Sequence, residues 1–178
     1  MELLQDEDPE LREYAAVTLR DFPSEMAFEA LVVATGDPSE GVRWHATEAL
    51  GALSLSEATT PLLAVLGDSV PHIRYAALRF LAARQIAEVI PVAMELARSD
   101  GVRDRAEGVM ALGTLGMPEG LPVVMRCVSD EHSWVREEAV IALLRIGAKE
   151  AVPALEGALD DENREVRLYA AEVLKRLR

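Results

Sequence analysis

The sequence predicts an all-α fold, an α-solenoid (superhelix) of about five 31-residue helix pairs with half-repeats at both ends. Half of the 178 residues are hydrophobic, but only 4% are aromatic. We therefore expect a core of Ala, Leu and Val side chains, which suits closely packed helices better than β-sheets. An arginine recurs every 31 residues, and a leucine follows each arginine by seven residues. A fixed period of this length indicates a repeat architecture.

The period is visible in several columns of equivalent residues. The arginine column comprises Arg12, Arg43, Arg74, Arg105, Arg136 and Arg167. An aspartate stands six residues before five of these arginines, at Asp6, Asp37, Asp68, Asp130 and Asp161. These columns divide a single predicted domain (1–178) into repeats 6–36, 37–67, 68–98, 99–129 and 130–160, with half-repeats 1–5 and 161–178. The half-repeats are either caps or parts of a longer array.

The first helix of each repeat is predicted from apolar residues at steps of three and four, as in 133–146. Its start is marked by a capping side chain, for example Asp8 before Pro9. Gly116 and Gly147 mark the end of two of these helices, because glycine accepts the left-handed cap conformation.

The second helix is exemplified by 119–128, which turns Leu121, Val124 and Val128 inward. Proline recurs near its beginning, at Pro91, Pro122 and Pro153, where the amides of a first turn have no intrahelical partner. Neither helix of a repeat can bury its apolar face alone, so the helix pairs are expected to stack.

The pattern D-x-x-x-x-V-R-x-x-A-x-x-A-L-G resembles the HEAT-like repeats of the phycocyanobilin-lyase type. Segments 37–54 and 130–147 carry the resemblance best, and it covers essentially the whole chain. The fourth repeat departs from the pattern at Ser99, Asp104 and Gly108, where a local irregularity or a bend is expected. The resemblance is specific for fold and weak for function, since one fold serves many functions.

The aspartate and arginine columns are predicted to form a structural ladder, which the resemblance also implies. Each aspartate lies just before a first helix and is expected to bridge to an arginine of its own or the next repeat. Without such pairs the stacked guanidinium groups would repel one another. The predicted ladder comprises Asp37, Arg43, Asp68, Arg74, Arg105, Asp130, Arg136, Asp161 and Arg167.

The charge of the chain limits its partners. The net charge is −13, and residues 1–68 hold 14 acids against 3 bases. We therefore expect neither nucleic acid nor an anionic membrane as a partner. The single cysteine, the acidic amino terminus and the lack of a long apolar run predict a cytoplasmic location.

Catalytic and metal-binding motifs are not found in the sequence. His45, His72 and His132 occupy different columns and form no pair with metal-ligand spacing. Cys127 falls in a column of small or apolar residues and is expected to be a buried thiol. We therefore predict no catalytic residue, no metal and no cofactor.

Two surfaces are candidates for binding a partner protein. Trp44, His45 and Tyr75 lie on neighbouring first helices and form either a partner-binding patch or a filling between repeats. The second helices are expected to line a concave groove with two outward columns: Ala30, Pro61, Val92, Val123 and Ala154, and Val33, Ala64, Glu95, Arg126 and Gly157. The groove is rimmed by Glu57, Glu88, Glu119 and Glu150. Alternatively, Val92 and Val123 are covered by neighbouring helices.

The favoured hypothesis is a non-enzymatic scaffold that binds a partner protein through this concave face. Its candidate contacts there are Val92, Glu95, Val123 and Arg126. The acidic first third favours a basic partner or one that presents an amphipathic helix. The alternative, implied by the resemblance, is a bilin lyase or isomerase-type subunit that binds a linear tetrapyrrole near Trp44, His45 and Tyr75.

Overall fold

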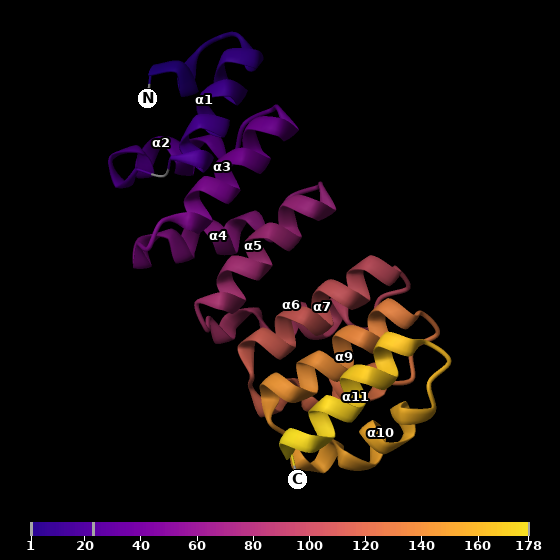
Figure 1. The fold of residues 1–178 in the computed structure, drawn as a ribbon. Coiled ribbons are helices and arrows are strands. Elements are labelled where there is room, and N and C mark those ends of the chain that lie inside the picture. Colours follow the sequence, from indigo (N-terminus) through magenta and orange to yellow (C-terminus); the bar gives the residue numbers. More distant parts are fainter. Residues whose placement is uncertain (1, 23, 178) are drawn as a thin grey trace. The chain divides into compact units, whose positions relative to one another are not determined.

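The computed structural model describes residues 2–22 and 24–177, and all regular secondary structure in these ranges is helical (Figure 1). This confirms the predicted fold class. The chain divides into two compact units, Met1–Arg84 (unit 1) and Gln85–Arg178 (unit 2). The boundary falls inside the repeat 68–98, between its two helices. The assignment of 1–178 to one domain stays a prediction.

The first helices begin at intervals of 31 residues. They are α1 (Pro9–Asp21), α3 (Glu40–Ala52), α5 (Pro71–Ala83), α7 (Val102–Leu115), α9 (Ser133–Ile146) and α11 (Arg164–Leu177). The predicted helix 133–146 is therefore correct at both ends. In unit 1, α3 packs between α1 and α5, and in unit 2, α9 packs between α7 and α11 (Figure 1).

The second helices follow the same period but are short. They are α2 (Phe28–Ala34), α4 (Thr59–Val65), α6 (Ile90–Leu96), α8 (Leu121–Cys127) and α10 (Val152–Gly157). Each is preceded by a three-residue 3-10 turn, such as Pro118–Gly120 before α8. The predicted segment 119–128 is thus a 3-10 turn followed by two turns of α-helix.

The helix ends follow from local chemistry. The side chain of Asp8 accepts a hydrogen bond from the backbone N–H of Glu10 at 2.9 Å, which caps α1. Gly116 and Gly147 have φ values of 64° and 70° and end α7 and α9, as predicted. In this conformation the N–H of Gly116 donates to the carbonyl oxygen of Leu112, which an open helix end would leave unpaired.

The repeating apolar columns form the core of each unit. Leu50 and Leu81 in unit 1 and Leu143 in unit 2 are fully buried. These leucines lie seven residues after the recurring arginine, so the 31-residue period is a repeat of core positions. Burial of such side chains is the main favourable contribution to folding.

Gly108 explains one departure of the fourth repeat. A Cβ atom at this position would lie 2.5 Å from the carbonyl oxygen of Ala93 and 2.5 Å from the backbone nitrogen of Ala97. Helix α7 nevertheless begins in register with the other first helices. The glycine therefore permits a close approach between α7 and the end of α6, both in unit 2.

Candidate protein-binding surface

The aspartate and arginine columns meet as bidentate ion pairs. In each pair the arginine Nε lies 2.7 Å from the aspartate Oδ2, and Nη2 donates to Oδ1 of the same carboxylate. The pairs are Arg12–Asp37 and Arg43–Asp68 in unit 1, and Arg105–Asp130 and Arg136–Asp161 in unit 2. Each aspartate side chain therefore pairs with the arginine of the preceding repeat, and not with that of its own or the next repeat.

Within its own repeat, each arginine contacts backbone. Nη1 of Arg43 donates to the carbonyl oxygens of Asp37 and Pro38 at 3.0 and 3.2 Å. Arg74 and Arg167 make the equivalent contacts with carbonyl oxygens five and six residues earlier. In the four ion pairs, the arginine thus connects the turn before its own helix with the aspartate of the following repeat. For Arg74 the equivalent position of the following repeat is Ser99, which carries no charge.

The aspartates of the ladder are held in the charged state. Burial acts to raise the pKa of Asp68, but hydrogen bonds from Arg43 and from the backbone N–H of Val70 outweigh it and keep this pKa below its ordinary value. For Asp161, the hydrogen bond from Arg136 is the largest influence and also lowers the pKa. The guanidinium groups of Arg43 and Arg136 thus donate to carboxylates within the protein. The structural role of the arginine column stays a prediction.

The second helices expose one of the two predicted columns. Val33, Ala64, Glu95, Arg126 and Gly157 are all exposed, as are the rim residues Glu57, Glu88, Glu119 and Glu150. We call these residues, in each unit separately, the second-helix surface. The other column is partly covered: Val92 is half-buried, and Val123 is only 1% exposed. Val123 lies on the buried face of α8. It is therefore part of the core and not a contact for a partner.

A hollow recurs on the second-helix surface. In unit 1, a hollow of about 460 Å³ lies between α2 and α4 and is lined by residues that include Val33, Ala64 and the pair Arg43–Asp68. In unit 2, a hollow of about 330 Å³ is lined by the equivalent pair Arg136–Asp161 and by Gly157, which corresponds to Ala64. The same repeat geometry therefore creates, in both units, a hollow whose walls include small residues such as alanine and glycine.

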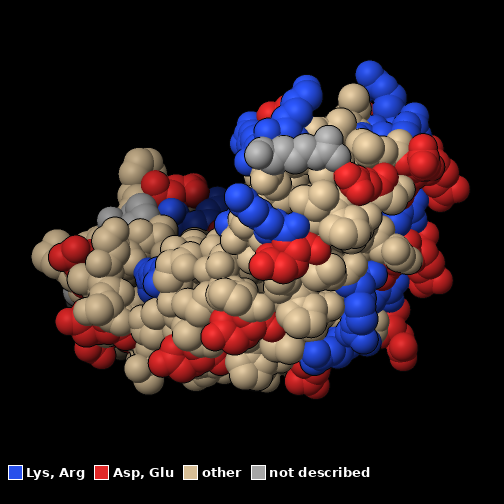
Figure 2. Space-filling model, turned by 90° about the horizontal axis from the view of Figure 1, so that it is seen from below, with Lys and Arg blue, Asp and Glu red and all other residues tan. Residues whose placement is uncertain are grey.

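The charged residues leave much of the surface uncovered. Figure 2 shows one face of the molecule, on which broad uncharged areas lie among the acidic and basic side chains. The exposed large apolar side chains among the described residues include Tyr14, Phe22, Met26 and Val33 in unit 1, and Trp134 and Leu168 in unit 2. Exposed apolar side chains of this kind are candidate contacts for a partner protein.

The predicted aromatic patch is mostly enclosed. Tyr75 is 4% exposed, so it is not an anchor for a partner. The side chain of His45 is 14% exposed and lies 3.1 Å from the Arg20 guanidinium. Burial and the charge of Arg20 lower the pKa of His45. Trp44 meets the ring of His72 edge-on at 5.0 Å between centroids. These residues fill the space between neighbouring first helices of unit 1.

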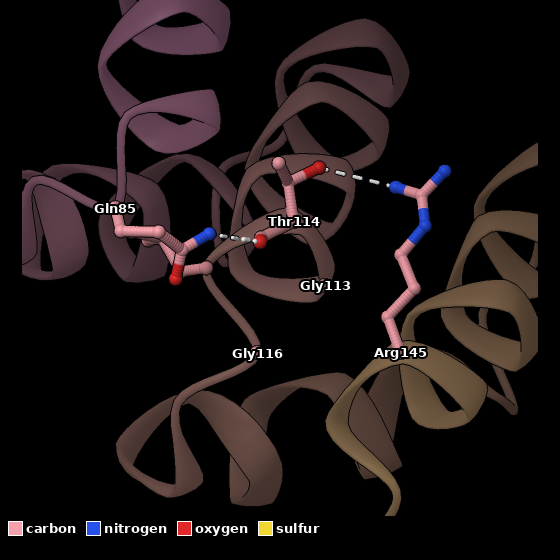
Figure 3. A pocket seen from close by; sticks show the side chains of 6 residues that line it. Gln85, Gly113, Thr114, Gly116 and Arg145 are labelled. Carbon is pink, nitrogen blue, oxygen red and sulfur yellow. Dashed lines mark hydrogen bonds between the residues drawn. The ribbon is translucent and has the colours of Figure 1, made fainter.

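A third hollow was not predicted from the sequence. It measures about 490 Å³ and lies in unit 2 at the carboxyl ends of α7 and α9 (Figure 3). The Gln85 side-chain amide donates to the Thr114 carbonyl oxygen at 2.8 Å, and Arg145 Nη1 donates to Thr114 Oγ1 at 3.1 Å. Among the described residues, those that line this hollow include no carboxylate, imidazole or thiol. The Gln85 and Arg145 side chains here contact the carboxyl-terminal turn of α7.

The remaining reactive groups are dispersed or buried. Cys127 is buried, and burial raises the pKa of its thiol, which disfavours the nucleophilic thiolate. In the described part of the chain, no group of three or more His, Cys, Asp or Glu side chains is arranged to hold a metal ion. A search of the same residues finds no helix with the length and apolar character needed to cross a membrane.

The stacked helix pairs, the 31-residue period and the inter-repeat ladder define an α-helical repeat protein. The chain belongs to the HEAT repeat family: the sequence model of this family matches residues 1–82 and 90–175. A comparison with curated protein sequences finds no match.

Solved structures share the architecture at low sequence identity. A designed armadillo repeat protein in complex with the peptide (KR)4 is 20% identical, with a TM-score of 0.77 over 99% of this chain and 97% of that chain. The CpcE–CpcF complex of phycocyanin lyase from Nostoc sp. PCC7120 includes a chain that is 20% identical, with a TM-score of 0.66 over 84% of this chain and 99% of that chain. Escherichia coli YibA is 19% identical, with a TM-score of 0.70 over 97% of this chain and 67% of that chain. At this identity the likeness concerns the fold.

Proposed function

We propose that this protein is a non-enzymatic scaffold that binds a partner protein through its second-helix surface. The main support is the hollow that recurs in both units on this surface. Apart from the Arg–Asp pair, its walls are mostly small or apolar residues. The arginine in each hollow, Arg43 or Arg136, already forms an ion pair with an aspartate. Such a hollow suits the side chains of a protein segment better than an anionic metabolite.

The similarity to a designed repeat protein in complex with a peptide also supports this proposal. That protein carries the basic peptide (KR)4 on the same architecture. The excess of acidic residues in this chain favours a basic partner, because complementary charge speeds association and selects against acidic competitors.

Affinity capture with surface variants tests the proposal. Ala64→Arg and Gly157→Arg fill the two hollows at exposed positions, and a Cβ at Gly157 would meet nothing within 4 Å. Both variants are therefore expected to fold and to lose the partner. Ala52→Arg and Ala83→Arg add the same charge at exposed positions on first helices and should keep it. If a partner is recovered equally with all four variants, the second-helix surface is not its binding site.

A bilin lyase or isomerase-type subunit is the second candidate, supported by the likeness to the phycocyanin lyase chain. Within this chain, the enclosed state of Tyr75 and His45 leaves little of the predicted contact set accessible to a tetrapyrrole. Mixing the protein with a linear tetrapyrrole and recording the visible spectrum tests this candidate. An unchanged spectrum would exclude it.

A further inference from the structure

We infer that the groove between α2 and α4 in unit 1 binds a partner segment with an aliphatic side chain flanked by lysine or arginine. We define this α2–α4 groove by the hollow that is lined by Val33 of α2 and by Pro61 and Ala64 of α4. Met26 precedes Val33 by seven residues, in the 3-10 turn before α2. The inference rests on the proposed function and adds the position and the chemistry of the contact.

The apolar character of this groove is specific to α2 and the turn before it, and the other second helices do not share it. Met26 and Val33 are 86% and 69% exposed. The positions equivalent to Met26 are also exposed in the other repeats, but they carry glutamate: Glu57, Glu88, Glu119 and Glu150. The positions equivalent to Val33 are also exposed and carry Ala64, Glu95, Arg126 and Gly157. Exposure is therefore a property of the repeat, whereas large apolar side chains at both positions are a property of segment 25–34, which comprises a 3-10 turn and α2.

The hollow beside Val33 provides the place for an aliphatic side chain. Its walls include Val32, Val65 and Pro61, and its volume is about 460 Å³. Burying one branched aliphatic side chain from water contributes about 1.5–3 kcal/mol. Side chains buried in well-packed pockets contribute most of the binding energy at protein interfaces.

The surroundings of the groove select for a cationic segment. Residues 21–42 and 52–73 contain no lysine or arginine, while Glu25, Glu29 and Glu57 are exposed there. The nearby Arg43 donates through Nε, Nη1 and Nη2 to groups within unit 1. It therefore attracts a carboxylate only weakly. Lysine or arginine residues beside the anchor would meet the uncompensated glutamates.

The equivalent hollow in unit 2 lacks this combination. Ala158, Ala154 and Gly157 stand where unit 1 has Val65, Pro61 and Ala64. In unit 2, Arg126 is exposed on α8, and Lys149 is exposed in the 3-10 turn before α10. A basic segment with an aliphatic anchor should therefore prefer unit 1.

Selection from a library of random peptides displayed on phage tests the inference with the full chain as bait. We expect enriched peptides to contain Leu, Ile, Val or Met next to two or more Lys or Arg residues. The dissociation constant of a synthetic enriched peptide is then measured by fluorescence anisotropy. The double variant Met26→Ser/Val33→Ser should weaken binding about tenfold or more. The double variant Glu25→Gln/Glu29→Gln should weaken binding and reduce its dependence on salt.

The controls separate this inference from the proposed function. Ala52→Ser, on a first helix, should leave the affinity unchanged, and circular dichroism melting of each variant verifies folding. Enrichment of acidic peptides, failure to enrich any peptide, or indifference to Met26→Ser/Val33→Ser would overturn the inference. If enriched peptides instead lose binding with Gly157→Arg and not with Met26→Ser/Val33→Ser, the second-helix surface still binds peptides, but the α2–α4 groove is not the site.

Discussion

The ion pair Arg136–Asp161 is a local test of what holds neighbouring repeats together. The two side chains are 8% and 9% exposed and make a bidentate contact. Arg136→Ala would leave the Asp161 carboxylate enclosed without its partner, so the free energy of unfolding should fall by about 3 kcal/mol. Denaturant titration measures this loss. Arg167→Ala removes contacts with two carbonyl oxygens and should cost less, and an unchanged stability of Arg136→Ala would contradict a structural role.

The same pair predicts a dependence on pH. The pKa of Asp161 is lower in the folded than in the unfolded chain, where it is about 3.9. Its contribution to stability is therefore present above pH about 4 and is lost as the pH falls through the folded pKa. The difference in unfolding free energy between wild type and Arg136→Ala should shrink from pH 7 to pH 3. A difference that stays constant would mean that charge pairing is not its cause.

Single residues were predictable where they repeat and less so where they do not. The arginine and aspartate columns predicted a ladder, but spacing alone did not show that each aspartate meets the preceding arginine. That choice depends on how successive helix pairs stack. The sequence left open whether Val92 and Val123 are exposed or covered, and the structure differs between the two: Val123 is buried and Val92 is half-buried. The enclosure of Tyr75 depends on neighbouring helices in the same way.

Helix positions were predictable from the period. All first helices begin 31 residues apart, and Gly116 and Gly147 end two of them in the left-handed conformation. The 3-10 turns before the second helices were not predicted. Apolar periodicity over so few residues does not distinguish a 3-10 turn from a first turn of α-helix.

The packing of α7 on α6 predicts opposite effects for two glycine substitutions. Gly108→Ala would press a methyl group against the α6 backbone and should destabilise unit 2 by about 1–3 kcal/mol, despite the better helix propensity of alanine. Gly157→Ala adds a methyl group where nothing lies within 4 Å and should stabilise α10 by about 0.5–1 kcal/mol. Thermal melting compares the two variants. Equal effects of the two substitutions would contradict the close approach of α6 and α7.

For the molecule as a whole, charge was countable from the sequence, but its placement was not. The acid excess of residues 1–68 is evident from composition. Its consequence for binding depends on which segments are exposed. Segments 21–42 and 52–73, which contain α2 and α4, present the exposed residues Glu25, Glu29 and Glu57 and no lysine or arginine. The same architecture occurs in a designed peptide binder and in a lyase complex. Particular function therefore depends on the exposed residues that break the repeat.

The most direct test of the scaffold proposal compares the amounts of partner that two double variants of equal added charge recover in affinity capture. Ala64→Arg/Gly157→Arg fills the hollows of both units, and Ala52→Arg/Ala83→Arg adds the same charge to first helices. With equal amounts of folded bait, the first variant should recover about a tenth or less of the partner that the second recovers. A ratio near one would contradict binding through the second-helix surface.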